Sequence, residues 1–269
     1  MSDRYQTFRK LHESGCFVIP NPWDVGSALY LKKLGFKALA STSSGFAFSK
    51  GLPDEGLTRD IVLQHLTEIV QAVNLPVNAD FQAGYGDTPE QVGESVRLCG
   101  QTGVAGLSIE DATGKKDKPL FEISEALERL KAAREAIDKS GKDLLLTARA
   151  ECYLVGHPSP LQESIKRIQA YAEAGADVLF APGPTKPDEI RAIVDAVKPK
   201  PVNVIAHVNA GLKVSDFAEL GVRRISVGSA LCRAAWTGFA RAATLIQEQG
   251  SFAGFDGSVS FGELNEIFG

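Results

Sequence analysis

Short runs of apolar residues recur along this chain, and segments with helical periodicity separate them. The runs are continuous rather than alternating, which is typical of strands that are buried on both faces of a parallel sheet. The pattern therefore predicts eight strands, at Cys16–Pro20, Ala38–Thr42, Val77–Phe81, Ala105–Glu110, Leu144–Ala148, Val178–Ala181, Val202–Ala206 and Ile225–Gly228.

The segments between these runs place their apolar residues on one face of a helix. Two examples are Val62, Leu66, Ile69 and Val73, and Ile123, Leu127, Leu130 and Ile137. Thr88 and Ser159 each precede a proline and a capping-box glutamine, which predicts that a helix begins there. Four glycines just before a strand are predicted to end the preceding helix: Gly35, Gly103, Gly175 and Gly221.

Eight successive strand–helix units favour an α/β fold of the (β/α)8, or TIM-barrel, type over an open doubly wound sheet. A doubly wound sheet often has a glycine-rich dinucleotide loop after its first strand, whereas this chain has Pro20–Asp24 there. No linker divides the sequence, so residues 1–269 are expected to form one barrel domain. Ser251–Gly269 is expected to add a C-terminal amphipathic helix.

The composition of the chain argues against several kinds of partner and site. The chain has 269 residues, 44% apolar content and a net charge of −4 without a basic stripe, so no nucleic-acid partner is expected. No apolar run is long enough to span a membrane, and no membrane partner is expected. The four cysteines lie far apart without a CxxC motif, which indicates neither a zinc site nor a disulfide framework. The N-terminus lacks a signal-peptide layout, and we expect a cytoplasmic location.

Charged residues stand where several predicted strands end. In a (β/α)8 barrel the active site forms at these carboxyl ends. Asp80 and Glu110 end two neighbouring strands, and Arg149 follows the next. Unpaired carboxylates there would lose their charge by desolvation, so one interpretation is a bound divalent cation in the style of Mg²⁺, with Arg149 facing a substrate carboxylate. The alternative is a structural ion-pair network of the same three residues.

Three loops near these strand ends allow two interpretations each. Ser43–Phe46 is either a plain turn or a set of backbone donors for an oxyanion. Ser49–Gly56 and Gly114–Lys118 are either lids or ordinary surface loops. Asn203 and His207 belong to another predicted strand end, and both are expected near the barrel mouth.

Several motifs, in order, make the chain resemble the isocitrate lyase / phosphoenolpyruvate mutase superfamily, in its phosphoenolpyruvate mutase-like branch. Val77–Gly86 is similar to its D-A-D-x-G-[FY]-G segment, and Ser108–Asp111 to its x-I-E-D motif. Thr147–Glu151 resembles its A-R-x-E strand. Ser44–Phe46 and Gly51–Asp54 fit its carboxylate-binding turn and its gating loop. The agreement extends from about Asn21 to Ser229.

The resemblance implies a (β/α)8 barrel, Mg²⁺ or Mn²⁺ as cofactor, and substrates that pass through a pyruvate-like enolate. It also implies a homo-oligomer, dimer or tetramer, in which the helices from about residue 230 are exchanged between subunits. The metal site is expected at Asp80, Glu110 and Asn78. The residues expected to bind a 2-oxo acid are Ser44, Gly45, Phe46 and Arg149, to which we add Asn203. The residues expected to act in catalysis are Asp54, Lys116 and Arg149.

Three departures from the family pattern narrow the expected activity. Asn78 replaces the first aspartate of D-A-D, Lys118 stands where isocitrate and methylisocitrate lyases carry a cysteine, and Pro182 stands where phosphonomutases carry a histidine. We therefore expect C–C cleavage or decarboxylation of a small 2-oxo diacid. The alternatives are phosphoryl migration between phosphoenolpyruvate and phosphonopyruvate, and a non-catalytic barrel that binds a metabolite.

Overall fold

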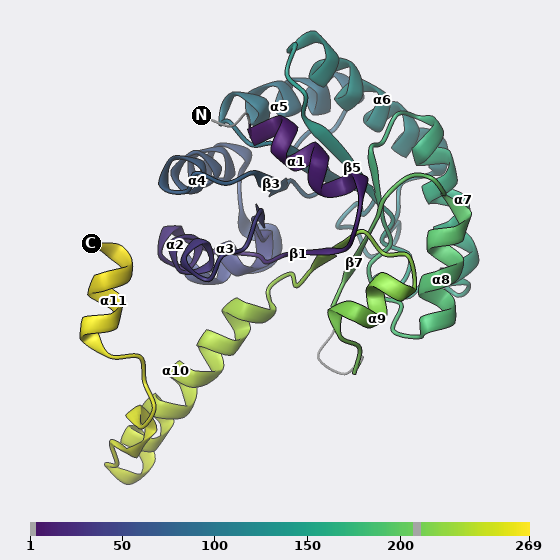
Figure 1. Ribbon diagram of the computed structural model, residues 1–269. Helices are drawn as coiled ribbons and strands as arrows, with labels where there is room; N and C mark the ends of the chain where they lie inside the picture. The colour runs from purple at the N-terminus through teal and green to yellow at the C-terminus, as the bar shows by residue number, and fades with distance from the viewer. Residues whose placement is uncertain (1–3, 207–210) are drawn as a thin grey trace.

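The predicted (β/α)8 barrel is confirmed. The computed structural model of the chain describes residues 4–206 and 211–269. Eight strands, all parallel to their neighbours, follow the order β1-β8-β7-β6-β5-β4-β3-β2. The two ends of this sheet meet where the backbone N–H of Ala40 donates to the carbonyl of Pro20 at 3.0 Å. Helices α4 to α8 surround the strands (Figure 1).

The strands are β1 (Phe17–Ile19), β2 (Leu39–Ala40), β3 (Val77–Asp80), β4 (Gly106–Glu110), β5 (Leu145–Arg149), β6 (Val178–Phe180), β7 (Val202–Ile205) and β8 (Arg224–Ser226). All eight lie at predicted positions, and most are one or two residues shorter than predicted because the hydrogen-bonded ladder ends before the apolar run does. Two strands shift by one residue, so that β5 includes Arg149 and β8 begins at Arg224.

The helices are α1 (Arg4–Glu13), α2 (Val25–Lys33), α3 (Ser43–Ser49), η1 (Asp54–Gly56), α4 (Arg59–Ala72), α5 (Pro89–Gln101), α6 (Ile123–Lys139), α7 (Pro160–Glu173), α8 (Pro187–Ala196), α9 (Val214–Glu219), α10 (Ala230–Gln249), η2 (Ala253–Phe255) and α11 (Phe261–Phe268). The capping box at Thr88 is confirmed. The predicted helix start at Ser159 is also confirmed, since Ser159 is the N-cap residue of α7 and Pro160 stands in its first turn, but the Ser159 side chain makes no capping hydrogen bond. All four predicted helix-ending glycines have φ between 87° and 99°.

Helix α1, which the pattern did not predict, closes the amino end of the barrel. Phe8 is fully buried in one cluster with Ala38, Ala105 and Leu145, which lie at or just before the first residues of their strands. It lies so close to β4 that a Cβ on Gly106 would be 2.9 Å from the Phe8 ring. With this end filled, the carboxyl ends of the strands remain as the open face of the barrel.

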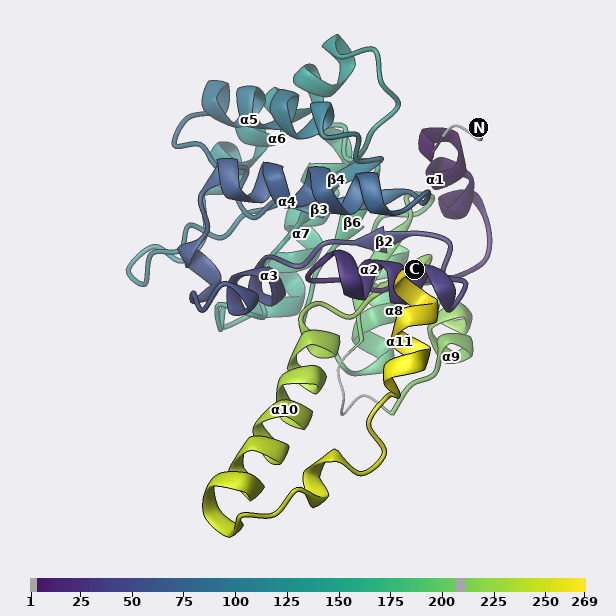
Figure 2. The same cartoon turned by 90° about the vertical axis from the view of Figure 1, so that its left-hand side faces the viewer.

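The C-terminal helical segment is also confirmed, but α10 projects away from the barrel instead of covering it (Figures 1 and 2). Only Cys232 and Ala242 of its twenty residues are buried. Its exposed apolar side chains are Leu231, Trp236, Phe239 and Ile246. The chain then turns back, and α11 packs against α2 (Figure 2).

Candidate active site

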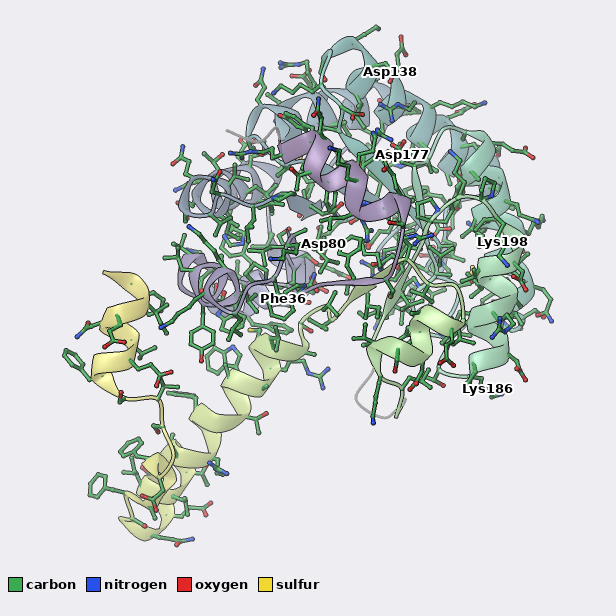
Figure 3. All side chains as sticks on the ribbon, in the orientation of Figure 1. Phe36, Asp80, Asp138, Asp177, Lys186 and Lys198 are labelled. Carbon is green, nitrogen blue, oxygen red and sulfur yellow. The ribbon has the colours of Figure 1, made fainter. Side chains whose placement is uncertain are left out.

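The structure brings Asp80, Glu110 and Arg149 together at the carboxyl ends of three adjacent strands. Glu110 and Arg149 are direct partners in the β4–β5 register. The Arg149 Nη1 atom lies 3.2 Å from Glu110 Oε2 and 3.6 Å from Asp80 Oδ1. In Figure 3, Asp80 lies inside the ring of helices, whereas Asp138 and Lys198 lie at its periphery. Whether these residues bind metal and substrate stays a prediction.

A buried network that was not predicted holds Arg149 in place. Its Nε pairs with Oε1 of Glu151, which is only 4% exposed. The backbone N–H of Glu151 donates to Asp111 Oδ1 at 2.8 Å. Asp111 Oδ2 accepts from Arg167 Nη1 at 2.9 Å and from the Tyr171 hydroxyl at 2.6 Å. The Arg149 guanidinium is therefore held at its Nε by Glu151, which is itself held by Asp111.

The Ser43–Phe46 segment is the first turn of α3 rather than a plain turn. Thr42 caps this helix: its Oγ1 accepts from Gly45 N at 3.2 Å, and its carbonyl accepts from Phe46 N at 3.0 Å. Ser43 N donates to Asp80 Oδ2 at 2.9 Å, which ties the helix to the carboxylate. Of the backbone donors in the predicted site, only the Ser44 N–H has no acceptor in the part of the chain that the structure describes.

The two candidate lids differ in their relation to the cluster. Gln82 Nε2 donates to the Asp54 carbonyl at 3.1 Å and anchors the first lid. Although Asp54 as a residue is exposed, desolvation raises the pKa of its carboxyl, a hydrogen bond with the Ser43 side chain opposes this rise, and Asp80 adds to it. Asp54 therefore lies beside the cluster. Lys116, in the second lid, is exposed, and no contact with the cluster is recorded for it.

The cluster carries more negative than positive charge. Burial raises the pKa of the Glu110 carboxyl, Arg149 opposes this, and the nearby Glu151, Asp80 and Asp54 add to it. Four carboxylates thus share one guanidinium. Within residues 4–206 and 211–269, no group of three or more His, Cys, Asp or Glu side chains is arranged to hold a metal ion. Any bound cation would thus need water or substrate oxygens as further ligands, which is how Mg²⁺ usually binds.

A cavity of about 50 Å³ opens beside Asp80 and Arg149 inside the barrel. The amides of Asn78 and Asn203 both line it, and both are buried. The Oδ1 atom of Asn78 has no hydrogen-bond partner among the described residues, so it can accept from a bound group. His207 lies outside the described residues.

Arg224 lines the same cavity, although it was not among the predicted site residues. Its strand was predicted to begin at Ile225, one residue later. The available signal was the pair Arg223-Arg224 directly before an apolar run, because only one of two adjacent strand residues can face solvent.

Comparisons with known proteins give matches that extend over most of the chain. The sequence model of the phosphoenolpyruvate phosphomutase family matches residues 8–247. A solved protein of Burkholderia cenocepacia J2315, described as a candidate lyase or mutase, is 46% identical with a TM-score of 0.95, covering 98% of this chain and 96% of that one. The 2-methylisocitrate lyase of Escherichia coli K12 is 33% identical over 189 residues, 67% of this chain and 61% of that protein.

A third relative was solved with ligands. Oxaloacetate acetylhydrolase, in complex with its product oxalate and with the inhibitor 3,3-difluorooxaloacetate, is 25% identical with a TM-score of 0.87. The match covers 98% of this chain and 93% of that one.

Proposed function

Because the chain belongs to the phosphoenolpyruvate phosphomutase family, within the isocitrate lyase superfamily, we propose that it is a lyase for a small 2-oxo diacid. The proposed reaction is C–C cleavage or decarboxylation through a pyruvate-like enolate. The observation that carries the proposal is the meeting of Asp80, Glu110 and Arg149 at the open end of the barrel, beside a polar cavity. The name of one relative, oxaloacetate acetylhydrolase, supports the substrate class, and the name of another, 2-methylisocitrate lyase, supports a lyase reaction.

The donor set fits a divalent cation. Asp80 and Glu110 supply carboxylate oxygens, Asn78, two residues before Asp80 on β3, has an unpartnered Oδ1, and the excess negative charge of the cluster favours a cation. We propose Mg²⁺ or Mn²⁺. When bound, such an ion supplies Lewis-acid stabilisation of negative charge on substrate oxygens.

The chain's own residues would orient the substrate and manage protons. Arg149, fixed by Glu151, presents its free edge to a substrate carboxylate. The Ser44 N–H is available to an oxyanion. Asp54, whose pKa is raised, is placed to hold the proton that the enolate carbon takes up after the bond breaks. Lys116 could reach the site only if its loop closes.

Two alternatives each rest on one observation. The matching family model is named for a phosphomutase, which favours phosphoryl migration, whereas Pro182 occupies the position of the phosphonomutase histidine. Arg149 is already paired with three of the four carboxylates of the cluster, which favours a structural network in a non-catalytic, metabolite-binding barrel. The cavity beside Asp80 and Arg149 favours an enzyme over a purely structural network.

We also propose that the protein is a homo-oligomer, dimer or tetramer, assembled through the segment from about residue 230. The exposed apolar side chains of α10 and a hollow of about 370 Å³ between α10 and Gly254–Ser258 support this proposal. None of the described helices is both long and apolar enough to pass through a lipid bilayer. A cytoplasmic location remains part of the proposal.

A screen of 2-oxo acids tests the proposed function. Oxaloacetate, longer 2-oxo diacids and phosphonopyruvate are incubated with the protein, with Mg²⁺ and with EDTA, and the products are followed by proton and phosphorus NMR. The proposal predicts Mg²⁺-dependent cleavage of a 2-oxo diacid. Phosphoenolpyruvate formed from phosphonopyruvate would support the phosphomutase instead, and turnover that survives EDTA would exclude the metal-assisted mechanism.

A further inference from the structure

Arg224 is a buried cation that contacts only neutral groups. It is 3% exposed and begins β8. Its Nε donates to Asn203 Oδ1 at 2.8 Å, and its Nη2 donates to Thr147 Oγ1 at 3.0 Å. Its Nη1 lies 3.3 Å from Nε2 of His12, a ring that burial keeps neutral by lowering its pKa to about 3.

The charge of Arg224 lacks a counter-charge in the described part of the chain. Arg167, which is also buried, and the half-buried Arg149 are ion-paired with carboxylates, whereas Arg224 forms no ion pair with any of the described residues. Desolvation lowers its pKa to about 9, and no carboxylate raises it. A buried cation without a counter-ion is costly unless a ligand completes its surroundings.

The Arg224 guanidinium has N–H groups that these contacts do not use, and Arg224 borders the active-site cavity. An arginine carries five N–H groups, and the three contacts above use three of them. Arg224 lines the same cavity of about 50 Å³ as Asp80 and Arg149, together with Asn203 and Ser226. One water needs roughly 10–15 Å³ of such volume, so the cavity has room for a group of carboxylate size and not for a long chain.

We propose that Arg224 forms an inner anion subsite that binds the second carboxylate of the substrate, so that the enzyme selects dicarboxylic over monocarboxylic 2-oxo acids. This inference rests on the proposed function, since it assumes that the first carboxylate binds at the Asp80–Arg149 mouth. The inner carboxylate supplies the counter-charge that Arg224 lacks and accepts its two remaining N–H groups. Asn203 positions the guanidinium through its Oδ1.

Two inhibitors of different length separate the subsite from the mouth. Oxalate has no carboxylate beyond its two-carbon unit, whereas 3,3-difluorooxaloacetate is a non-cleaving 2-oxo diacid. Calorimetry with Mg²⁺ measures both affinities. Arg224→Gln is expected to weaken the binding of 3,3-difluorooxaloacetate by about 30-fold or more, because a charge-assisted hydrogen-bond pair is lost. The affinity of the Arg224→Gln variant for oxalate should change by less than about 3-fold, because changes at sites that share no partner have independent effects.

Asn203→Asp keeps the test decisive if Arg224→Gln does not fold. An aspartate keeps the acceptor for Arg224 Nε and places a negative charge beside it, so it should preserve the fold while repelling the inner carboxylate. The exposed Asn74→Asp is the matched control and should leave both affinities unchanged.

The outcomes separate the two proposals. Selective loss of 3,3-difluorooxaloacetate affinity in Asn203→Asp supports the subsite. Equal affinity for that inhibitor in wild type and Asn203→Asp, or a parallel loss for both inhibitors, overturns the subsite and leaves the proposed function standing. If neither inhibitor binds the wild type with Mg²⁺, the proposed function itself fails.

Discussion

At the scale of single residues, Arg149 connects the parts of the site. It faces Asp80 and Glu110 on one side and is held by Glu151 on the other, so its guanidinium has little freedom to move. A fixed cation loses less entropy when it binds a carboxylate than a mobile one does. The same ion pairs hold the carboxylates of Asp80 and Glu110 in place.

Asp80→Asn removes one negative charge and keeps the size of the side chain. We expect kcat/KM for the 2-oxo diacid found in the screen to fall by at least about 10²-fold, the usual cost of losing one electrostatic contact to the transition state. Steady-state kinetics at saturating Mg²⁺ measures this. The exposed Asp60→Asn should be unaffected, and a wild-type rate in Asp80→Asn would contradict the assigned role.

A second prediction concerns His65, which is buried and stacks on Phe46 with ring centroids 3.6 Å apart. Burial lowers its pKa to about 4 in the folded protein, below the usual 6.5. The unfolded chain therefore binds the proton more tightly, and the stability present above pH 6.5 is lost as the pH falls toward 4. From pH 7 to pH 5 the loss from this group is about 2 kcal/mol.

Thermal melts between pH 4 and pH 8 test the His65 prediction. His65→Phe keeps the stacked ring and removes the titrating nitrogen, so its melting temperature should fall less steeply below pH 6.5 than that of the wild type. His157→Phe serves as the control, because His157 is only partly buried. Parallel pH profiles for wild type and His65→Phe would show that His65 does not carry this effect.

The sequence placed Asp80, Glu110 and Arg149 correctly because each follows a clear apolar run, and strand ends meet on one side of a barrel. Glu151 and Arg224 were not predicted as residues of the site, for two different reasons. Glu151 stands beyond its strand in a loop whose path is set by Asp111, a contact across 40 positions. Arg224 stands one residue before the predicted strand, and the Arg223-Arg224 pair indicates only that one of the two arginines faces the barrel interior, not which one.

At the scale of elements, α3 shows how tertiary contacts override a local pattern. Its sequence, SSGFAFS, has weak helix propensity and reads equally well as a turn. Three contacts fix it as a helix: the Thr42 cap, the Asp80 carboxylate on Ser43 N, and the packing of Phe46 on His65. These contacts connect α3, and with it Ser44, to the cluster of Asp80, Glu110 and Arg149.

Gly45→Ala tests how closely α3 is packed. A Cβ at this position would lie 2.6 Å from Thr42 Cγ2 and 3.1 Å from Trp23 Cβ, so the helix must shift. We expect a destabilisation of about 1–3 kcal/mol in denaturant titrations and a raised KM.

Gly93→Ala, in α5, is the matched control, because its Cβ would meet nothing closer than 3.4 Å. It should leave KM unchanged. If Gly45→Ala matched this control in both stability and KM, α3 would not be as tightly placed as described.

At the scale of the whole molecule, the barrel leaves α10 without a surface to pack on. The sequence predicted a helical segment there, but a helical pattern does not say whether its apolar face meets the same chain or another. Trp236 and Phe239 are 46% and 63% exposed, which is unusual for large apolar side chains of a helix. A second copy of the chain is the partner that the resemblance implied.

Phe239→Glu should therefore weaken the assembly. Light scattering after size exclusion is expected to show a dimer or tetramer for the wild type and a smaller species for Phe239→Glu, because a buried unpaired charge disfavours an apolar interface. Leu34→Glu changes an exposed apolar residue on the barrel instead and should keep the wild-type mass. A monomeric wild type would refute assembly through α10.

We propose that Asp80 and Glu110 hold a divalent cation opposite Arg149, and that this ion is needed to bind the substrate. Oxalate, which mimics the enolate, tests it directly in calorimetric titrations with Mg²⁺ and with EDTA. We predict that wild type binds oxalate only with Mg²⁺, and that Asp80→Asn loses this binding while remaining folded. Equal oxalate affinity with Mg²⁺ and with EDTA would show that no divalent cation at Asp80 and Glu110 is needed for binding.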